Sequence, residues 1–343
     1  MRNRILRKGS SRNRNAIATV AFIGLGAMGV PMVANLEKAG FRVRTYDVNG
    51  KGNCASGREA AEGAQVLVTM LPNGAIVREA VLQALPGLAR GAIVLDMSSS
   101  DPAGTRELSR RLARRGIELV DAPVSGAVIG ARNATLAIMV GGSPRAFERV
   151  RPVLEAMGRQ IFHVGPTGAG HAVKALNNYL GAVGTIAGFE ALLIARKFGL
   201  DPEPMLAAIN ASTGRNSTTE RKIPRDILPG TFASGFRLAL MAKDVGIAAG
   251  LAKGLGLKTP FLATTLRTWK AAQRALPADA DHVEIYKVQE ALALGRAMGQ
   301  EARRKARSGR RSTRRAPSRG RKLPSRAAAA RRSPARRRLR LST

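Results

Sequence analysis

The sequence predicts an α/β fold with a doubly wound parallel sheet, followed by an all-α domain that a long helix joins to it. Three observations predict this architecture. Apolar runs typical of buried strands alternate with helical segments as far as residue 166. A glycine-rich turn follows the first of these runs. Beyond Gly168 the strand patterns stop, and the later apolar segments have helical spacing.

The first strand, expected at 17–23, leads into a turn of the form G-x-G-x-x-G. Gly24 allows the tight turn, Gly26 lets a pyrophosphate approach the backbone, and Gly29 lets the following helix, expected at 28–39, pack closely on the strand. The helix N-terminus then faces the anion. Strand, turn and helix in this order predict the phosphate-binding corner of a Rossmann-type dinucleotide-binding domain.

The second strand, expected at 41–46, ends at Asp47. A carboxylate at this distance from the glycine turn is placed to accept a hydrogen bond from a ribose 2′-hydroxyl and to repel a 2′-phosphate. The sequence therefore predicts NAD as the cofactor, with NADP as the alternative because Arg44 and Lys51 are close in the chain.

The rest of the first domain continues the alternation. We expect strands at 65–71, 92–97, 117–121, 136–140 and 161–164, and helices at 73–85, 102–115 and 144–157. The segment after Asp47 is short and contains Gly50, Gly52 and Gly57, so we expect a loop in place of a full crossover helix there.

The second domain is expected to be all-α. Residues 172–198 contain no proline and predict one long helix, in which Gly181, Gly184 and Gly188 indicate close approach of another helix. Further helices are expected at 202–211, 243–254, 260–275 and 282–300. The predicted division is a dinucleotide-binding domain at 17–166 and an all-α domain at 167–300, between a basic extension at 1–16 and a tail at 301–343.

The two ends of the chain are much more basic than its middle. They carry +6 (residues 1–16) and +17 (residues 301–343) of a net charge of +34. Both lack hydrophobic periodicity and are expected to be disordered. The first is read as a plain extension or as an organellar transit segment; a signal peptide is disfavoured because it would consume the glycine turn. The second is either a non-specific nucleic-acid or polyanion contact or a solvated appendage.

Two bulk features concern the compartment. The single cysteine, Cys54, excludes an internal disulfide and fits the cytoplasm, or an organellar matrix if residues 1–16 are a transit segment. No uninterrupted apolar run reaches the roughly 18 residues of a membrane span.

Lys174 and Asn178 are the first candidates for chemistry. They are four residues apart and share one face of the long helix, among apolar neighbours that predict a buried turn. A lysine there can protonate a carbonyl oxygen as a hydride arrives and take the proton back in oxidation. The alternative is a lysine that extends its ammonium to the surface.

Two further candidate segments are less distinctive. Ser125 and the amides near Gly126 follow a strand, where they can bind a carboxylate or form a plain turn. Lys243-Asp244 and residues 281–287 are equally typical of a solvated helix face. The three histidines are too scattered to predict a metal site.

Six motifs follow one another in the chain: the glycine turn with Pro31-Met32 and Asn35-Leu36, then Met70-Leu71-Pro72-Asn73, Asp96-Met97-Ser98-Ser99, Asp121 to Gly126, Gly168 to Asn178, and Lys243-Asp244. This set resembles the β-hydroxyacid dehydrogenases, the 3-hydroxyisobutyrate dehydrogenase family, over about residues 18–295. The resemblance implies an NAD(P)-dependent oxidoreductase of small β-hydroxy acids or their semialdehydes, such as 3-hydroxyisobutyrate or tartronate semialdehyde. It also implies a homodimer or homotetramer with the all-α domain at the interface.

The resemblance also implies a role for each matching residue. Cofactor contacts are implied for Gly24, Leu25, Gly26, Ala27, Met28, Gly29, Leu71, Pro72, Ser98 and Lys243. Substrate contacts are implied for Ser125, Gly126 and Asp244. Lys174 is implied as the general acid and base, and Asn178 as the residue that orients it.

The sequence departs from the family pattern at four points, of which one is a shortened segment at 81–91. Ala127 stands where a second glycine is usual, the crossover after Asp47 is short, and the arginine-rich tail is not a family feature. A second hypothesis is therefore a non-catalytic or moonlighting polyanion-binding protein built on the same fold. Relatives of that kind tend to lose the lysine, as do imine reductases of this fold, so the presence of Lys174 favours catalysis.

Overall fold

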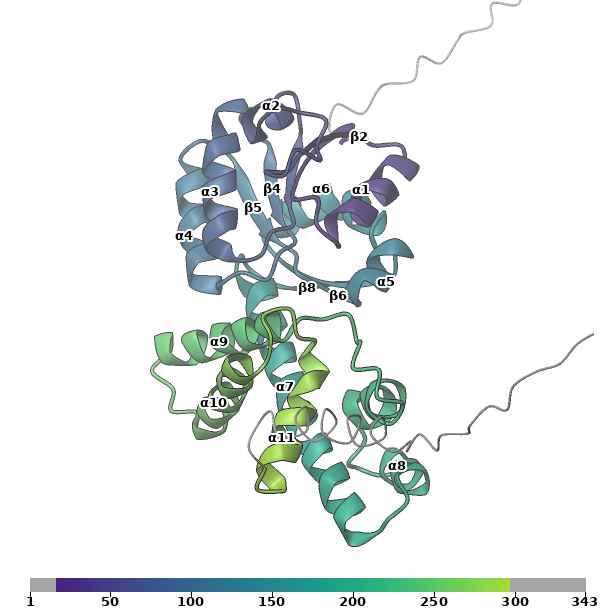
Figure 1. Ribbon diagram of the computed structural model, residues 1–343. Helices are drawn as coiled ribbons and strands as arrows, with labels where there is room; N and C mark the ends of the chain where they lie inside the picture. Colours follow the sequence, from purple (N-terminus) through teal and green to yellow (C-terminus); the bar gives the residue numbers. More distant parts are fainter. Residues whose placement is uncertain (1–16, 297–343) are drawn as a thin grey trace, which may run out of the picture. The chain divides into compact units, whose positions relative to one another are not determined.

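The computed structural model describes residues 17–296 (Figure 1). The predictions for residues 1–16 and for the tail at 301–343 lie outside the described residues, whereas the last helix, expected to reach residue 300, ends at Ala293. The first part of the chain contains eight strands: β1 Thr19–Ile23, β2 Arg42–Tyr46, β3 Val66–Thr69, β4 Ile93–Asp96, β5 Glu118–Asp121, β6 Val124–Ser125, β7 Leu136–Gly141 and β8 Gly158–Gly165. Its helices are α1 Gly29–Lys38, α2 Gly57–Ala61, α3 Gly74–Ala84, η1 Leu85–Gly87, α4 Pro102–Ala113, α5 Ala127–Arg132 and α6 Pro144–Glu155.

The strands form one sheet in the order β2-β1-β3-β4-β5-β7-β6, with β8 paired to β7. The five strands from β2 to β5 are parallel, and so are β7 and β8. The sequence predicted a parallel sheet throughout, whereas β7 runs antiparallel to β5 and β6. The reason is the length of α5, because a helix of six residues spans only about 9 Å and cannot carry the chain back across the sheet.

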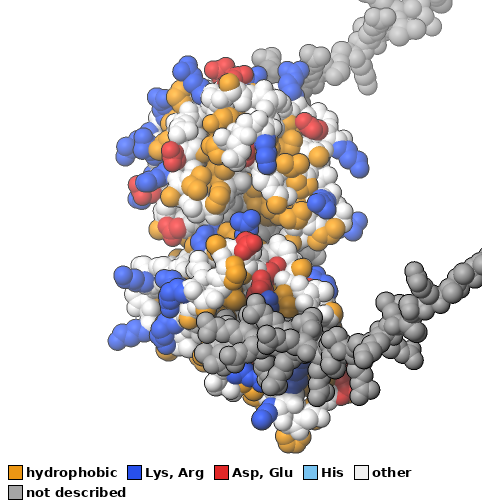
Figure 2. Space-filling view, in the orientation of Figure 1, with side chains coloured by type: hydrophobic (Ala, Val, Ile, Leu, Met, Phe, Trp, Pro, Cys, Tyr) orange, Lys and Arg blue, Asp and Glu red, His pale blue; other side chains and the backbone are white. Residues whose placement is uncertain are grey.

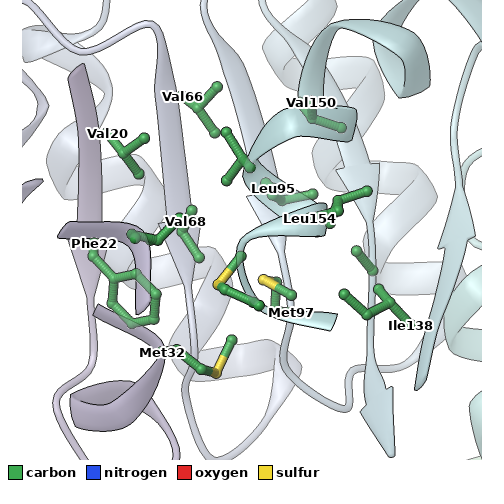
Figure 3. Packing of buried hydrophobic residues seen from close by; sticks show 14 of the residues in the cluster. Val20, Phe22, Met32, Val66, Val68, Leu95, Met97, Ile138, Val150 and Leu154 are labelled. Atoms are coloured by element: carbon green, nitrogen blue, oxygen red, sulfur yellow. The ribbon is translucent and has the colours of Figure 1, made fainter. Parts of the chain in front are cut away.

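Helices cover both faces of this sheet, as the alternating pattern requires. Helices α1 and α6 cover one face and α2, α3 and α4 the other (Figure 1). Figure 3 shows Phe22 of β1 and Met32 of α1 in the same packed layer as Leu95 of β4 and Leu154 of α6. These side chains are almost completely buried, so the strand ends are held on a rigid support.

The short segment after Asp47 is more ordered than a plain loop. Asn53 pairs with Thr45 twice: its amide donates to the threonine hydroxyl and its side-chain oxygen accepts from the threonine amide. A Cβ at Gly52 would lie 2.4 Å from the Thr45 carbonyl oxygen, so only glycine allows this approach. The segment thus covers the open edge of β2, and α2, which Ser56 caps, follows it.

The second part of the chain is helical, as predicted. Its elements are α7 Ala169–Phe198, α8 Pro202–Asn210, η2 Thr218–Ile227, α9 Leu238–Gly254, α10 Pro260–Ala275, η3 His282–Glu284 and α11 Ile285–Ala293. Helix α7 packs on α9, α11 and η2, and the fully buried Phe189 and Trp269 belong to this second core. The π-helical η2 had no counterpart in the sequence prediction.

The glycines of α7 do not all serve close packing. At Gly188 a Cβ would lie 3.0 Å from Thr218 of η2, and at Gly184 it would lie 3.5 Å from Asn216. At Gly181 there is nothing within 4 Å. The inference that another helix approaches closely therefore holds at Gly188 alone, because Asn216 precedes η2 and its distance from Gly184 is an ordinary contact.

By length and composition, α7 is also apolar enough to cross a membrane, which the count of uninterrupted apolar residues did not anticipate. The core helix of a globular protein meets the same criteria. One face of α7 packs against α9, α11 and η2, and several apolar side chains of the opposite face are exposed.

Candidate active site

The glycine turn has the geometry of a phosphate-binding corner. A Cβ at Gly29 would lie 1.9 Å from the Gly24 carbonyl oxygen, so the contact between α1 and the turn requires glycine. Gly26 faces open space, with nothing within 4 Å of a Cβ built there. Helix α1 has no capping side chain and no acid in its first turn, whereas Asn73 and Asp101 cap α3 and α4. The free amides at this terminus fit the pyrophosphate of a dinucleotide.

The other residues of the glycine turn differ in their exposure and hydrogen bonding. Ala27 is exposed and Met28 is half-buried, so both border the space in front of α1. Leu25 is buried, and its amide donates to Asp47 Oδ2 at 2.7 Å. The turn and the end of β2 are therefore fixed to one another. Around them, exposed apolar side chains gather over α1 and α5 (Figure 2), among them Val30 and Ile129.

Asp47 is ready to act as an ionised acceptor. Partial burial works against its charge, but hydrogen bonds from the amides of Asn49 and Leu25 outweigh it and hold the pKa of the carboxyl below its usual value. Arg44, a possible partner for a 2′-phosphate, instead donates to the carbonyl oxygens of Glu59 and Ala60 at the end of α2. The Lys51 ammonium also acts to lower the pKa of Asp47.

Two loops after β3 and β4 carry the residues expected on the nicotinamide side. Leu71 is half-buried and Pro72 exposed, whereas Ser98 is only 1% exposed. The Ser98 hydroxyl accepts from the Leu71 amide at 2.9 Å, so it joins the two loops from within. Lys243 of α9 donates to the carbonyl oxygens of Pro72 and Ser99 at 3.1 and 2.9 Å. The structure thus brings Lys243 of the helical part onto both loops.

Lys174, Asn178 and Asp244 form a buried polar group where α7 meets α9. Each is less than 10% exposed. Asn178 Nδ2 donates to Asp244 Oδ2 at 2.6 Å, and Lys243 Nζ lies 3.0 Å from Asp244 Oδ1. Within the described residues, Lys174 Nζ donates no hydrogen bond, so its amine is not committed to a protein acceptor.

Burial lowers the pKa of the Lys174 amine. The Asp244 carboxylate opposes this effect and the Lys243 ammonium adds to it. A buried lysine whose pKa is displaced towards neutrality is suited to proton transfer. The burial was predicted, but not its cause: Leu176 and Leu180, the apolar neighbours on which the prediction rested, are 48% and 68% exposed.

The loop that follows β5 has an unusual backbone. Ser125 ends β6 and is half-buried, and Gly126 precedes α5 with a φ of 134°. Ala127, which stands where the family has glycine, has a φ of 53°. This left-handed conformation strains an alanine and explains why glycine is usual there.

Sequence reasoning missed a row of buried polar residues beneath the two loops. Thr69, Asp96 and Asp121 are adjacent in register at the ends of β3, β4 and β5. Asp96 accepts from the hydroxyls of Thr69 and Ser100 and from the Ser98 amide. The sequence signal that could have revealed this row is the position of Asp96 and Asp121, each at the end of a buried apolar run. No group of residues that could bind a metal occurs within residues 17–296.

Two family models match the chain. One, the NAD-binding domain of 6-phosphogluconate dehydrogenase, matches residues 19–165. The other, described as the NAD-binding domain of NADP-dependent 3-hydroxyisobutyrate dehydrogenase, matches residues 168–289. The chain belongs to the β-hydroxyacid dehydrogenase family. It is an NAD(P)-dependent hydroxyacid dehydrogenase, which confirms the fold, the reaction class and the cofactor class that the sequence predicted.

Individual relatives agree with this assignment. The chain is 38% identical to a 2-(hydroxymethyl)glutarate dehydrogenase of Eubacterium barkeri, covering 74% of this chain and 89% of that protein. It is 35% identical to an NAD-dependent L-serine dehydrogenase of Pseudomonas aeruginosa, covering 78% and 97%. A solved structure of Mycobacterium tuberculosis 3-hydroxyisobutyrate dehydrogenase with L-serine is 35% identical, with a TM-score of 0.76, and covers 80% of this chain and 99% of that one.

Proposed function

We propose that this dehydrogenase oxidises a small 3-hydroxy acid of the 3-hydroxyisobutyrate type to its semialdehyde, and catalyses the reverse reduction, with Lys174 as the general acid and base. The observation that carries the proposal is the uncommitted amine of Lys174, buried one helical turn from Asn178. Two relatives support the substrate class, because they are named for 3-hydroxyisobutyrate and L-serine, which are both 3-hydroxy acids.

Each residue of the site has a defined task in this proposal. Ser125 and the Gly126 amide bind the substrate carboxylate and so fix the position of the hydroxyl group. In oxidation, neutral Lys174 accepts the hydroxyl proton at Nζ; in reduction, the ammonium returns a proton to the carbonyl oxygen. Asn178, which Asp244 orients, donates towards the same oxygen. Bound nicotinamide supplies the hydride acceptor in oxidation and the hydride donor in reduction.

The cofactor contacts follow from the same geometry. The α1 terminus and Gly26 hold the pyrophosphate, and Asp47 accepts from the adenosine ribose. Leu71 and Pro72 form the nicotinamide side, while Ser98 supports that loop from below. Lys243 fixes both loops against the helical part and excludes water there.

The test is a panel of small hydroxy acids and aldehydes incubated with the purified protein and either cofactor, with nicotinamide absorbance as the signal. We expect turnover of 3-hydroxy acids, 3-hydroxyisobutyrate and L-serine included. The semialdehyde of tartronate should be reduced. No turnover of any panel member by the wild-type protein would contradict the proposal and favour the non-catalytic alternative.

We also propose a homo-oligomer that covers the outer face of α7. Five large apolar side chains on this helix are exposed at helical spacing: Val173, Leu176, Leu180, Ile194 and Phe198. A stripe along a 30-residue helix is typical of a protein–protein interface, and a second copy of the chain is its proposed partner. Leu180→Asp should lower the mass measured by light scattering, with Lys258→Asp as an exposed control elsewhere.

For the place of the protein in the cell we propose the cytoplasm, on composition alone. A cytoplasmic location fits the single cysteine, and an organellar matrix is the alternative if residues 1–16 direct import. Localisation of the full chain and of a chain without residues 1–16, each fused to a fluorescent protein at the C-terminus, distinguishes the two.

A further inference from the structure

His171 lies in the first turn of α7, three residues before Lys174, and is 1% exposed. Its ring bridges two parts of the molecule. Nε2 lies 3.1 Å from the Ser98 carbonyl oxygen, and Nδ1 lies 2.8 Å from Thr105 Oγ1 of α4. Because a carbonyl can only accept, Nε2 carries a hydrogen and donates it to Ser98.

The backbone of this turn is anchored separately, to the sheet. Asp121 Oδ1 accepts from the Gly168 amide at 2.6 Å, and Oδ2 accepts from the His171 amide at 2.8 Å. The carboxylate of β5 therefore caps a helix that carries no cap of its own. At Gly141 and Gly170 a Cβ would lie under 3 Å from this cluster, so the helix start is pressed against the strand ends.

Two buried carboxylates flank the ring. Asp96 Oδ2 is 3.5 Å from Nε2 and Asp121 Oδ2 is 3.8 Å from Nδ1. Burial raises the pKa of Asp121, and the nearby His171 opposes that rise. The histidine is thus part of a continuous polar network across the ends of β3, β4 and β5, which a smaller or apolar side chain would interrupt.

The ring connects the helix of Lys174 to the nicotinamide-side loops. His171 bonds to the Ser98 carbonyl, and the Ser98 hydroxyl bonds to the Leu71 amide. From the other side, Lys243 bonds to the same two loops at Pro72 and Ser99. The two loops are therefore held from α7 by one side chain and from α9 by another.

We infer that His171 is a positioning residue, whose bond to the Ser98 carbonyl holds the loop that faces nicotinamide at a fixed distance from Lys174. This inference rests on the proposed function of Lys174. A displacement of about 1 Å between an acid–base group and the reacting atoms can cost about 100-fold in rate, so a single hydrogen bond at this point can control turnover.

Two variants of similar size separate this role from packing. His171→Gln places an amide NH₂ near the position of Nε2 and can keep the bond to Ser98. His171→Asn is shorter and reaches only towards Thr105. We expect His171→Asn to lower kcat by about 30- to 100-fold with a smaller change in KM, and His171→Gln to retain most of the turnover. Equal losses in both variants would overturn the inference.

A double-mutant cycle with Lys174→Ala shows whether His171 acts through the lysine. If it does, adding His171→Asn to Lys174→Ala causes little further loss of turnover. A full additional 30-fold loss in the double variant would contradict the inference. His282→Asn, at a histidine equally buried in the helical core, is the matched control: it should lower the unfolding temperature without this pattern in kcat.

The same experiment separates failure of the inference from failure of the proposed function. If the wild-type protein turns over 3-hydroxy acids and Lys174→Ala abolishes this, but His171→Asn is fully active, only the positioning role falls. If Lys174→Ala is as active as the wild-type protein, the proposed function of Lys174 falls first, and the role of His171 with it.

Discussion

Asn178 donates a hydrogen bond of 2.6 Å to Asp244, and this bond joins the helix that carries Lys174 to the helix that carries Lys243. Asp244 lies between two lysines with different environments. Lys243 is committed to backbone carbonyls of the nicotinamide-side loops, whereas Lys174 bonds to no described residue. The Asp244 carboxylate therefore opposes the lowering of the Lys174 pKa by burial, but it forms no hydrogen bond with the Lys174 amine.

Lys174→Ala should lower turnover by about two to four orders of magnitude, because general acid–base catalysis contributes about that much. Affinity for the cofactor should be unchanged, since the glycine turn and Asp47 are elsewhere. Turnover of 3-hydroxy acids and NADH binding by fluorescence measure the two effects. Near-normal turnover in the variant would exclude Lys174 as the acid and base; Lys222→Ala, at a half-buried lysine whose pKa is also lowered, serves as the control.

The lowered pKa of Lys174 also predicts opposite pH profiles for the two directions. Oxidation needs the neutral amine, so its rate should rise with pH and level off above the pKa. Reduction needs the ammonium, so its rate should fall over the same range. Because burial lowers the pKa, both changes should occur below the value of 10.5 for a free lysine. If the rates of oxidation and reduction instead change only near the pKa of a free lysine, the prediction is contradicted.

Asp47 should give the enzyme a preference for NAD over NADP. Its hydrogen bonds from Leu25 and Asn49 keep the carboxylate charged, and Arg44 is held by the end of α2. Asp47→Ala should therefore raise the efficiency with NADP relative to NAD, whereas Lys51→Ala should leave the order of preference unchanged. The measurement is kcat/KM with each cofactor. A clear preference of the wild-type enzyme for NADP would refute the assignment.

Local patterns were sufficient to predict most of the fold. The glycine turn, the long helix and the helix at Pro260–Ala275 depend on spacing within a short segment, which is visible in one sequence. The antiparallel entry of β7 and the π-helix η2 depend on packing between distant segments, so no local signal predicted them. The Lys174–Asn178 pair was predicted from helical spacing. The hydrogen bonds of Asp121 to the start of α7 and the bridge through His171 arise only when the strand ends and the helix start come together.

Ala127→Gly should stabilise the protein by about 0.5–1 kcal/mol. An alanine in the left-handed region carries a strain of roughly 1–2 kcal/mol, part of which the greater chain entropy of glycine offsets. Thermal or denaturant unfolding gives the change in free energy. Ala134→Gly, at a φ of 52°, should behave similarly, whereas Ala131→Gly in the helical part of α5 should destabilise. A loss of stability in Ala127→Gly would show that the methyl group has a packing role.

Lys222 should make stability depend on pH in the alkaline range. Burial lowers the pKa of this lysine to about 8 in the folded protein, against 10.5 when free. Between these values the unfolded chain binds the proton and the folded chain does not, so this group contributes rising stability with rising pH. Lys222→Met should reduce that rise, and the exposed Lys270→Met should not. Identical slopes of unfolding free energy from pH 8 to 10 in wild type and Lys222→Met would contradict the assignment.

Residues 301–343 should be dispensable for turnover and responsible for any binding of nucleic acid. Their eighteen Lys or Arg with one acid can neutralise phosphates and release counterions, so binding should be independent of sequence and weaken steeply as salt rises. The proposed site lies between Gly24 and Asp244, outside this tail. A chain that ends at Gln300 should keep its turnover and lose retention on DNA at low salt.

The folded body offers an alternative binding surface, since Lys and Arg gather over α9 and α10 (Figure 2). Undiminished DNA retention by the truncated chain would assign the binding to that surface, and lost turnover in a folded truncated chain would show that the tail completes the site or the oligomer.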